Sequence, residues 1–167
     1  MYAAITDFIE DWRAESERTA KVLEALTDAS LGFSPSGYDR TVGRLAWHLV
    51  TTVPEMLART GLQVENVDED APVPETALEI AEAYAEVSDQ LTGLVQEQWT
   101  DETLKVEDDM YGSRWMRGLT LQVLLRHEIH HRAQLTVLMR MAGLRVPGVY
   151  GPAREDWEDM GMTPPEV

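Results

Sequence analysis

Four segments of the chain repeat apolar residues at three- and four-residue steps, and this helical periodicity constrains the fold more than any other feature. The first segment runs from Tyr2 to about Leu26, with acids and arginines between its apolar positions. The second runs from Thr41, a residue suited to a helix N-cap, to about Thr60, and Gly61 stops it. Both segments are predicted to form amphipathic helices.

The third segment covers about residues 74–99, and the fourth covers about residues 115–141, with Leu119 as a later alternative start and Gly143 as its stop. Pro54 lies inside the second segment, where it is expected to kink the helix or to split it. No stretch has the pattern of a long strand or of a solenoid repeat.

The connections between these segments are polar. Residues 62–73 are acidic and contain proline, which predicts an exposed link. About fifteen polar residues precede the fourth helix, and they could form a short hairpin or only a loop. From about residue 144 the chain is rich in Gly and Pro and is too broken to be helical for most of its length. The sequence therefore predicts one all-α domain over residues 1–167, an antiparallel four-helix bundle with an irregular C-terminal tail from about 144.

Composition excludes several classes of function. The chain has no Cys, so it has no disulfides, no thiolate metal ligands and no Cys nucleophile. Its formal charge of −16 opposes direct binding to nucleic acid or to an anionic membrane surface. No apolar run could span a bilayer, and the N-terminus has no secretory signal pattern, so a cytoplasmic location is expected.

Three of the four histidines are predicted to meet inside the bundle. His127 and His131 stand four residues apart on the fourth helix, on a predicted inner stripe that includes Leu124 and Leu135. His48 falls on the predicted inner face of the second helix. Imidazoles from facing helices are a common way to bind a metal in a bundle. We expect one divalent metal ion at His48, His127 and His131, with positions open for water or substrate.

Two other interpretations of the histidines stay open on spacing alone. The imidazoles could form a buried hydrogen-bonded cluster without a metal. Residues 127–131 also match H-E-x-x-H, the zinc metalloprotease motif, in which Glu128 would be the general base. A protease normally adds a substrate-binding β-sheet and a third ligand downstream, and neither is evident here. Glu128 is about 100° around the helix from His127, which favours an ion pair with solvent or another helix.

The neighbours of the three histidines are candidates for contacts that orient the ligands or line the pocket. They are Glu128, His130, Arg132 and Gln134. Structural bonds to other helices are the favoured role for Arg132 and Gln134.

These motifs resemble the DinB/YfiT-like superfamily of bacterial metal-binding four-helix bundles. The family pattern H-x-x-x-H-R-x-Q is matched by His127, His131, Arg132 and Gln134, and a helix-two His is matched by His48. The tail segment 146–152, with Trp157 downstream, is similar to one branch of the family. The resemblance spans nearly all 167 residues.

The resemblance implies an up-down-down-up bundle, often a homodimer, in which three His bind nickel or zinc; iron and manganese are also compatible with nitrogen and oxygen ligands. Characterised relatives include thiol transferases and isomerases that use bacillithiol or mycothiol. The expected function is therefore that of a divalent-metal-binding protein, either a small-molecule thiol transferase or a hydrolase. The alternative is a non-catalytic metal-binding stress-response protein that acts as a dimer or through a partner.

Overall fold

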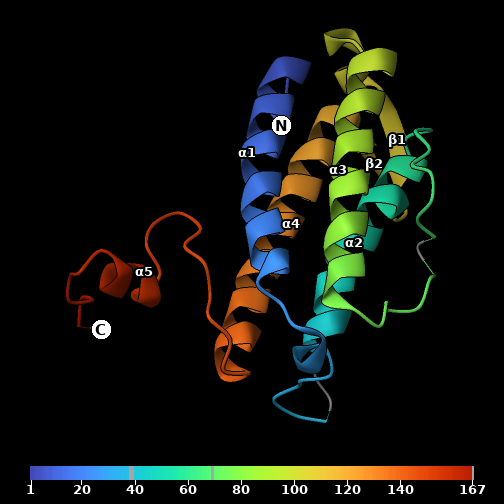
Figure 1. Ribbon diagram of the computed structural model, residues 1–167. Coiled ribbons are helices and arrows are strands. Elements are labelled where there is room, and N and C mark those ends of the chain that lie inside the picture. The colour runs from blue at the N-terminus through green and yellow to red at the C-terminus, as the bar shows by residue number, and fades with distance from the viewer. Residues whose placement is uncertain (38–39, 69, 167) are drawn as a thin grey trace.

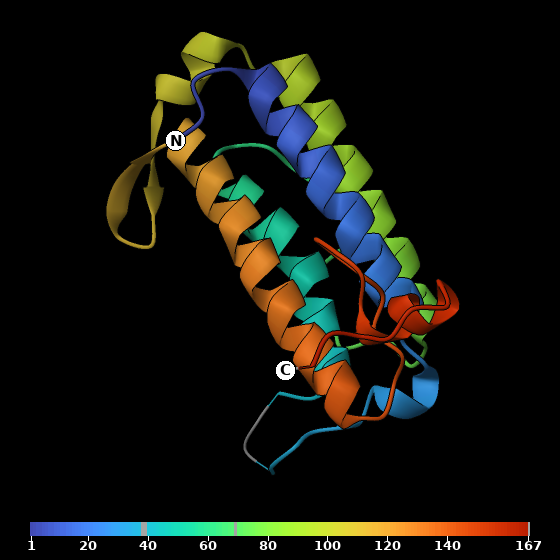
Figure 2. The ribbon, with the colours of Figure 1, turned by 90° about the vertical axis from the view of Figure 1, so that its left-hand side faces the viewer.

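The computed structural model describes residues 1–37, 40–68 and 70–166, and the protein is mostly helical (Figure 1). Four long helices lie side by side in two pairs, α1 with α3 and α2 with α4 (Figure 2). The two pairs contact each other through α2 with α3 and α1 with α4. The expectation of a helical protein is confirmed. The long helices are α1 (Ile5–Glu24), α2 (Val42–Ala58), α3 (Ala77–Gln98) and α4 (Arg117–Met141).

The polar stretch before α4 forms a hairpin, the first of the two predicted alternatives. Its strands β1 (Glu107–Met110) and β2 (Ser113–Met116) pair antiparallel. Tyr111 and Gly112 connect them with positive φ angles of 57° and 81°, the backbone of a tight hairpin turn. Three short helices complete the described secondary structure: η1 (Asp28–Ser30), η2 (Asp101–Lys105) and α5 (Arg154–Asp159).

Side-chain caps determine where two of the long helices begin. The Thr41 hydroxyl accepts a hydrogen bond from the Arg44 backbone N–H (3.1 Å), so the predicted cap of α2 is confirmed. Thr76 and Glu79 form a reciprocal capping box, with each side chain bonded to the other's backbone N–H. Because this box satisfies the first free amides, α3 begins at Ala77, three residues later than predicted.

Helix α2 is buried on almost every side. It contacts α3 and α4, and the connection from α2 to α3 passes back along its outer side (Figure 1). Trp47 fixes that connection by donating its indole N–H to the Ala71 carbonyl (3.0 Å). Pro54 is itself buried, and α2 continues through it, so the alternative of a split helix is wrong. Packing around the helix outweighs the hydrogen bond that the proline removes.

The buried stripe of α4 differs from the predicted one. Glu128 (3% exposed) and Arg132 (2% exposed) lie at its centre, whereas His127 and His131 are half-buried at its edge. The prediction placed His127 and His131 on the inner stripe, and Glu128 about 100° away from His127. The partners of the buried Glu128 and Arg132 come from distant segments. The buried members of α4 include Leu121, Leu124, Leu125, Glu128, Arg132, Leu135 and Met139.

Thr19 of α1 connects the two buried charged side chains. Glu128 Oε1 accepts hydrogen bonds from the Thr19 hydroxyl (2.8 Å) and the Tyr84 hydroxyl (2.7 Å). Arg132 donates to Thr19 Oγ1 (3.1 Å) and to the carboxylate of Glu15 (2.5 Å). The predicted solvent or interhelix ion pair of Glu128 is therefore wrong, because its hydrogen-bond donors are neutral hydroxyls. Burial raises the pKa of Glu128 to about 7.

The C-terminal tail joins the same network through Tyr150. The Tyr150 hydroxyl donates to Glu15 Oε2 (2.6 Å) and accepts from Arg132 (3.0 Å). In Figure 2 the tail lies in front of α1 and α4, and the Tyr150 hydrogen bonds join it to both helices. The network therefore links α1, α3, α4 and the tail.

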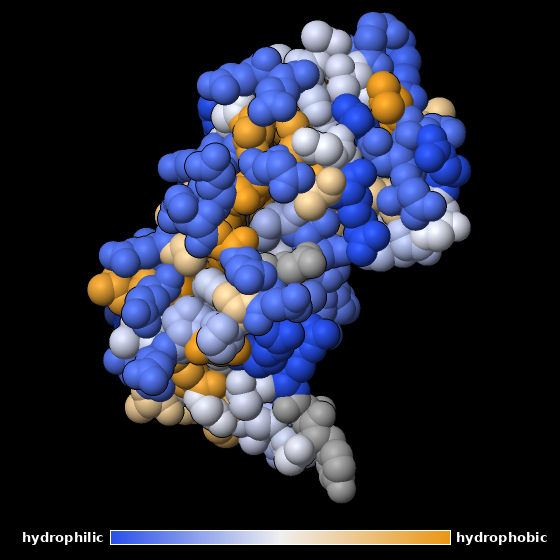
Figure 3. All heavy atoms as spheres, turned by 90° about the vertical axis from the view of Figure 1, so that its right-hand side faces the viewer, coloured by the Kyte–Doolittle hydropathy of each residue, from blue (hydrophilic) through white to orange (hydrophobic). Residues whose placement is uncertain are grey.

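Hydrophilic side chains cover most of the face shown in Figure 3, and apolar atoms appear there in separate patches. Within the described ranges, none of the helices is long and apolar enough to cross a membrane.

The substitution Thr19→Val tests the importance of the buried network. It removes the hydroxyl that donates to Glu128 and accepts from Arg132, so both charged groups lose a partner inside the protein. We expect the free energy of unfolding, measured by urea titration, to fall by about 1–3 kcal/mol. The matched control is Thr6→Val on the exposed side of α1, which should change stability by less than about 0.5 kcal/mol. Equal effects of the two substitutions would contradict a network role for Thr19.

Candidate metal centre

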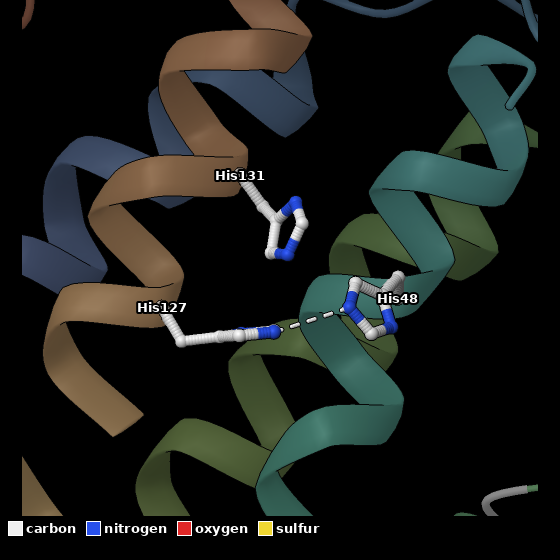
Figure 4. A group of neighbouring side chains, drawn as sticks. All are labelled: His48, His127 and His131. Atoms are coloured by element: carbon white, nitrogen blue, oxygen red, sulfur yellow. Dashed lines mark hydrogen bonds between the residues drawn. The ribbon is translucent and has the colours of Figure 1, made fainter. Parts of the chain in front are cut away.

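Three imidazoles from two helices converge on one point (Figure 4). His48 extends from α2, and His127 and His131 extend from adjacent turns of α4. Their ring centroids are 4.2–4.9 Å apart, and one nitrogen from each ring lies within 4.8 Å of the other two. All three side chains are half-buried. The three predicted ligands are therefore positioned so that they could hold one metal ion.

The spacing of the nitrogens is compatible with a shared metal ion and also with a hydrogen bond between two of the rings. Nε2 of His48 and Nε2 of His127 are 3.3 Å apart. Two ligands at about 2.0–2.1 Å from a tetrahedral ion are separated by about 3.3 Å, so these two nitrogens could share an ion without moving. Two imidazole lone pairs that face each other at this distance repel each other unless a proton or a cation lies between them.

Hydrogen bonds on the outer nitrogens orient two of the rings. The Gln134 side-chain oxygen accepts from Nδ1 of His131 (2.7 Å), which leaves Nε2 of His131 with its lone pair free. Thr52 lies on the Nδ1 side of His48 (3.5 Å), and its hydroxyl hydrogen is already donated to the His48 carbonyl (2.7 Å). Contacts of this kind fix the tautomer and direction of a metal-binding His.

The imidazoles are uncharged at neutral pH. Burial, followed by the nearby Arg40 guanidinium, lowers the pKa of His48 to about 4. Burial also lowers the pKa of His127 to about 4, followed by the effect of His131. The pKa of His131 is lowered by burial as well, against the hydrogen bond to Gln134. Because only a neutral imidazole can bind a metal, the three rings are ready to do so without losing protons.

The four predicted neighbours of the ligands divide into two groups. Gln134 contacts His131 directly, and the ring of the exposed His130 packs against the His131 ring with centroids 4.9 Å apart. Glu128 and Arg132 bind other groups, in the buried network behind α4. Arg132 thus makes the structural bonds to another helix that were favoured for it. The same role was favoured for Gln134, but its side chain contacts His131, a predicted metal ligand, on its own helix.

Two cavities open beside the three histidines. The larger, of about 500 Å³, includes His131 and Gln134 in its wall and is otherwise mostly apolar. The smaller, of about 330 Å³, includes His48 and is mostly polar, with Glu55, Arg59 and Asp70 in its wall. A ligand at the histidines could therefore extend in either direction.

Sequence reasoning missed two residues that line these cavities. Arg40 lies in the wall of the larger one, just before α2, and nothing in its local sequence marks it. Glu55 lies two turns after His48, and its carboxylate accepts from Arg59 (2.8 Å) and from the Tyr111 hydroxyl of the hairpin (2.7 Å). The spacing of Glu55 from His48 places both on one side of α2, which was the only available signal.

The chain is mostly helical, and three histidines from two of its helices converge on one point. These two features place it in the class of candidate metal-binding helical proteins. The DinB family model matches residues 1–166, and the chain belongs to the DinB family. It is 39% identical to YrdA of Bacillus subtilis strain 168 over 167 residues, which is the full length of both chains.

Two solved structures are similar to this one. A DinB-like protein from Bacillus cereus ATCC 10987 shares 43% identity with a TM-score of 0.86, covering 90% of this chain and 100% of its own. A second DinB-like protein, YjoA from Bacillus subtilis, has a TM-score of 0.67 and 19% identity, covering 86% of this chain and 97% of its own. The second likeness shows the fold alone.

The lowered pKa values predict how acid affects the metal-free protein. The ordinary His pKa is 6.5, whereas that of His48 and of His127 is about 4 in the folded protein. Between these pH values the unfolded chain binds more protons, so the free energy of unfolding should fall as pH is lowered from 6.5 toward 4. Urea titrations at pH 7 and pH 5 measure this loss.

A double variant, His48→Gln with His127→Gln, is the comparison for this pH effect. It should lose less stability than the natural chain between the same two pH values. Equal losses would show that burial does not lower the pKa of these two imidazoles.

Proposed function

We propose that His48, His127 and His131 bind one divalent metal ion and that the ion forms the centre of an active site for small molecules. The observation that carries the proposal is the convergence of three neutral imidazoles from α2 and α4. A set of three protein ligands is typical of catalytic sites, which keep a position open, whereas structural sites are usually closed by four.

Nickel and zinc are the ions we favour for this site. Imidazole suits both ions, and the chain has no Cys to direct the site toward softer metals. Iron and manganese are compatible with a shell of imidazole and water. Affinity order places nickel above iron and manganese, and availability in the cell then decides between nickel and zinc.

The reaction we propose is thiol transfer to a small molecule or hydrolysis of one. When bound, the metal would act as a Lewis acid and lower the pKa of a thiol or a water molecule. The cavities on the two sides of the histidines support a reactive site over a purely structural one, because both give access to the same point.

Several side chains of this protein have roles in the proposed reaction. Gln134 and Thr52 hold the outer nitrogens of His131 and His48, so that Nε2 of each ring faces the centre. Glu55 shares a cavity with His48 and is held by Arg59 and Tyr111. We assign Glu55 as the group that takes a proton from the reacting thiol or water.

The alternatives have less support. A non-catalytic metal-binding role does not require the two cavities. A metalloprotease requires the glutamate of H-E-x-x-H beside the metal, whereas Glu128 binds Thr19 and Tyr84 inside the protein. We also assign the four long helices to the up-down-down-up bundle, an assignment supported by their pairwise packing and by the long return connection between α2 and α3.

Metal content tests the proposed ligands. Protein purified without a His tag should contain about one equivalent of nickel or zinc after loading and desalting, measured by elemental analysis. His131→Ala should reduce this to less than about 0.2 equivalents, because two imidazoles alone bind weakly. The exposed neighbour His130 offers a matched control, and His130→Ala should keep the full content. Loss of metal from both variants, or from neither, would contradict the assignment.

An activity panel tests the proposed reaction. Metal-loaded protein is assayed with small thiols and electrophilic acceptors and, separately, with small esters and amides. We expect turnover that disappears in His131→Ala and falls by about 10²–10⁴ in Glu55→Gln, the usual contribution of a general base. The Glu55→Gln variant should still bind the metal. If the metal-loaded natural protein turned over no substrate of the panel faster than His131→Ala does, the result would count against an enzyme and in favour of the non-catalytic alternative.

A further inference from the structure

The larger cavity beside the metal centre combines an apolar wall with a single cationic group. Its apolar part comes from the segment before α2, from α2 and from α4, and consists of Pro35, Leu45, Val137 and Leu138. Val137 is 59% exposed, so its side chain is accessible to a ligand in the cavity. The polar part of the wall consists of Arg40, His131 and Gln134. The cavity volume of about 500 Å³ is within the range of small-molecule sites.

The cations near the active site fall into two groups. Arg59 and Arg132 are paired with Glu55 and Glu15, whereas among the described residues no carboxylate lies within ion-pair distance of Arg40 or of Arg44. Of the latter two, Arg40 is the one in the wall of the larger cavity. His131 lies in the wall of the same cavity. The positive charge of Arg40 therefore lies on the His131 side of the metal centre.

A guanidinium beside a cation site is unfavourable by itself, because like charges repel. Arg40 nevertheless stands there in a chain with 30 acidic and 14 basic residues. An anion in the cavity would remove this repulsion, since it would lie between the guanidinium and the metal and attract both. A guanidinium also binds a carboxylate through two parallel hydrogen bonds.

We propose that this cavity binds a small organic carboxylate with an apolar tail of several carbons. The carboxylate lies between Arg40 and the His131 side of the metal centre, and the tail lies against Leu45, Val137 and Leu138. The inference deepens the proposed function by naming its substrate class, and it rests on that function only for the additional attraction of the metal. The cavity wall and Arg40 do not depend on the metal.

The test is calorimetric titration of the full-length protein with acetate, butanoate, hexanoate and octanoate, both metal-loaded and metal-free. Each buried methylene contributes roughly a fourfold gain in affinity when fully buried. We therefore expect hexanoate to bind at least about tenfold more tightly than acetate to both forms, and more tightly to the loaded form.

Arg40→Gln should weaken hexanoate at least about fivefold and leave the neutral ligand hexan-1-ol unchanged. The matched control is Arg13→Gln, the same change at an exposed position of α1, which should leave both ligands unchanged. Val137→Ser should reduce the preference for hexanoate over acetate. Because Val137 is exposed, this variant is expected to fold.

Metal content measured on the same samples separates the two proposals. If the protein binds no metal but still prefers hexanoate to acetate, and Arg40→Gln still weakens hexanoate, the metal proposal is overturned and the carboxylate inference is supported. Protein that binds one metal ion but shows equal affinity for acetate and hexanoate, or no effect of Arg40→Gln, would overturn the carboxylate inference alone.

Discussion

Thr19 of α1 binds the carboxylate of Glu128 and the guanidinium of Arg132 on the buried face of α4. Each of these charged residues directly follows a histidine of the metal centre, His127 or His131. Consecutive residues of a helix point about 100° apart, so fixing the charged pair toward α1 and α3 turns the two histidines toward α2. Rotating α4 would strip both buried charges of their partners at a cost of several kcal/mol. The geometry of the candidate metal centre thus depends on a network formed by other residues.

Charge is distributed unevenly around the metal centre. The chain carries 30 acidic residues, yet the three imidazoles have no carboxylate within their cluster in the described part of the protein. Arg40 and Arg44 both lower the pKa of His48, after burial. Neutral ligands would leave a bound divalent ion with its full charge, and the arginines add to it. A locally positive site in an acidic protein favours anionic ligands and thiolates over neutral ones.

The sequence predicted the convergence of the three histidines better than it predicted their surroundings. The four-residue spacing of His127 and His131, and the position of His48 on its own helix, were enough to bring the three rings together. Periodicity placed the helix centres correctly, and the Thr41 cap as well. It failed on the rotation of α4, because hydrophobicity treats Glu128 as an outward residue. The partners that allow its burial, Thr19 and Tyr84, lie 109 and 44 residues away along the chain.

Other features had no local signal in the sequence. Arg40 is an ordinary residue of a polar loop, and only the fold brings it to a cavity shared with His131. The contact of Tyr150 with Glu15 crosses 135 residues and depends on the path of the tail. Interactions of this kind follow from tertiary packing, which residue spacing along one helix cannot express.

Anomalous diffraction from a crystal of the metal-loaded protein, recorded at the absorption edge of the metal, tests the central claim most directly. We predict one strong peak per chain at about 2.0–2.2 Å from a nitrogen of each of His48, His127 and His131, with the remaining positions taken by water or ligand oxygen. A metal peak within bonding distance of fewer than these three histidines, or one located elsewhere in the protein, would contradict the account.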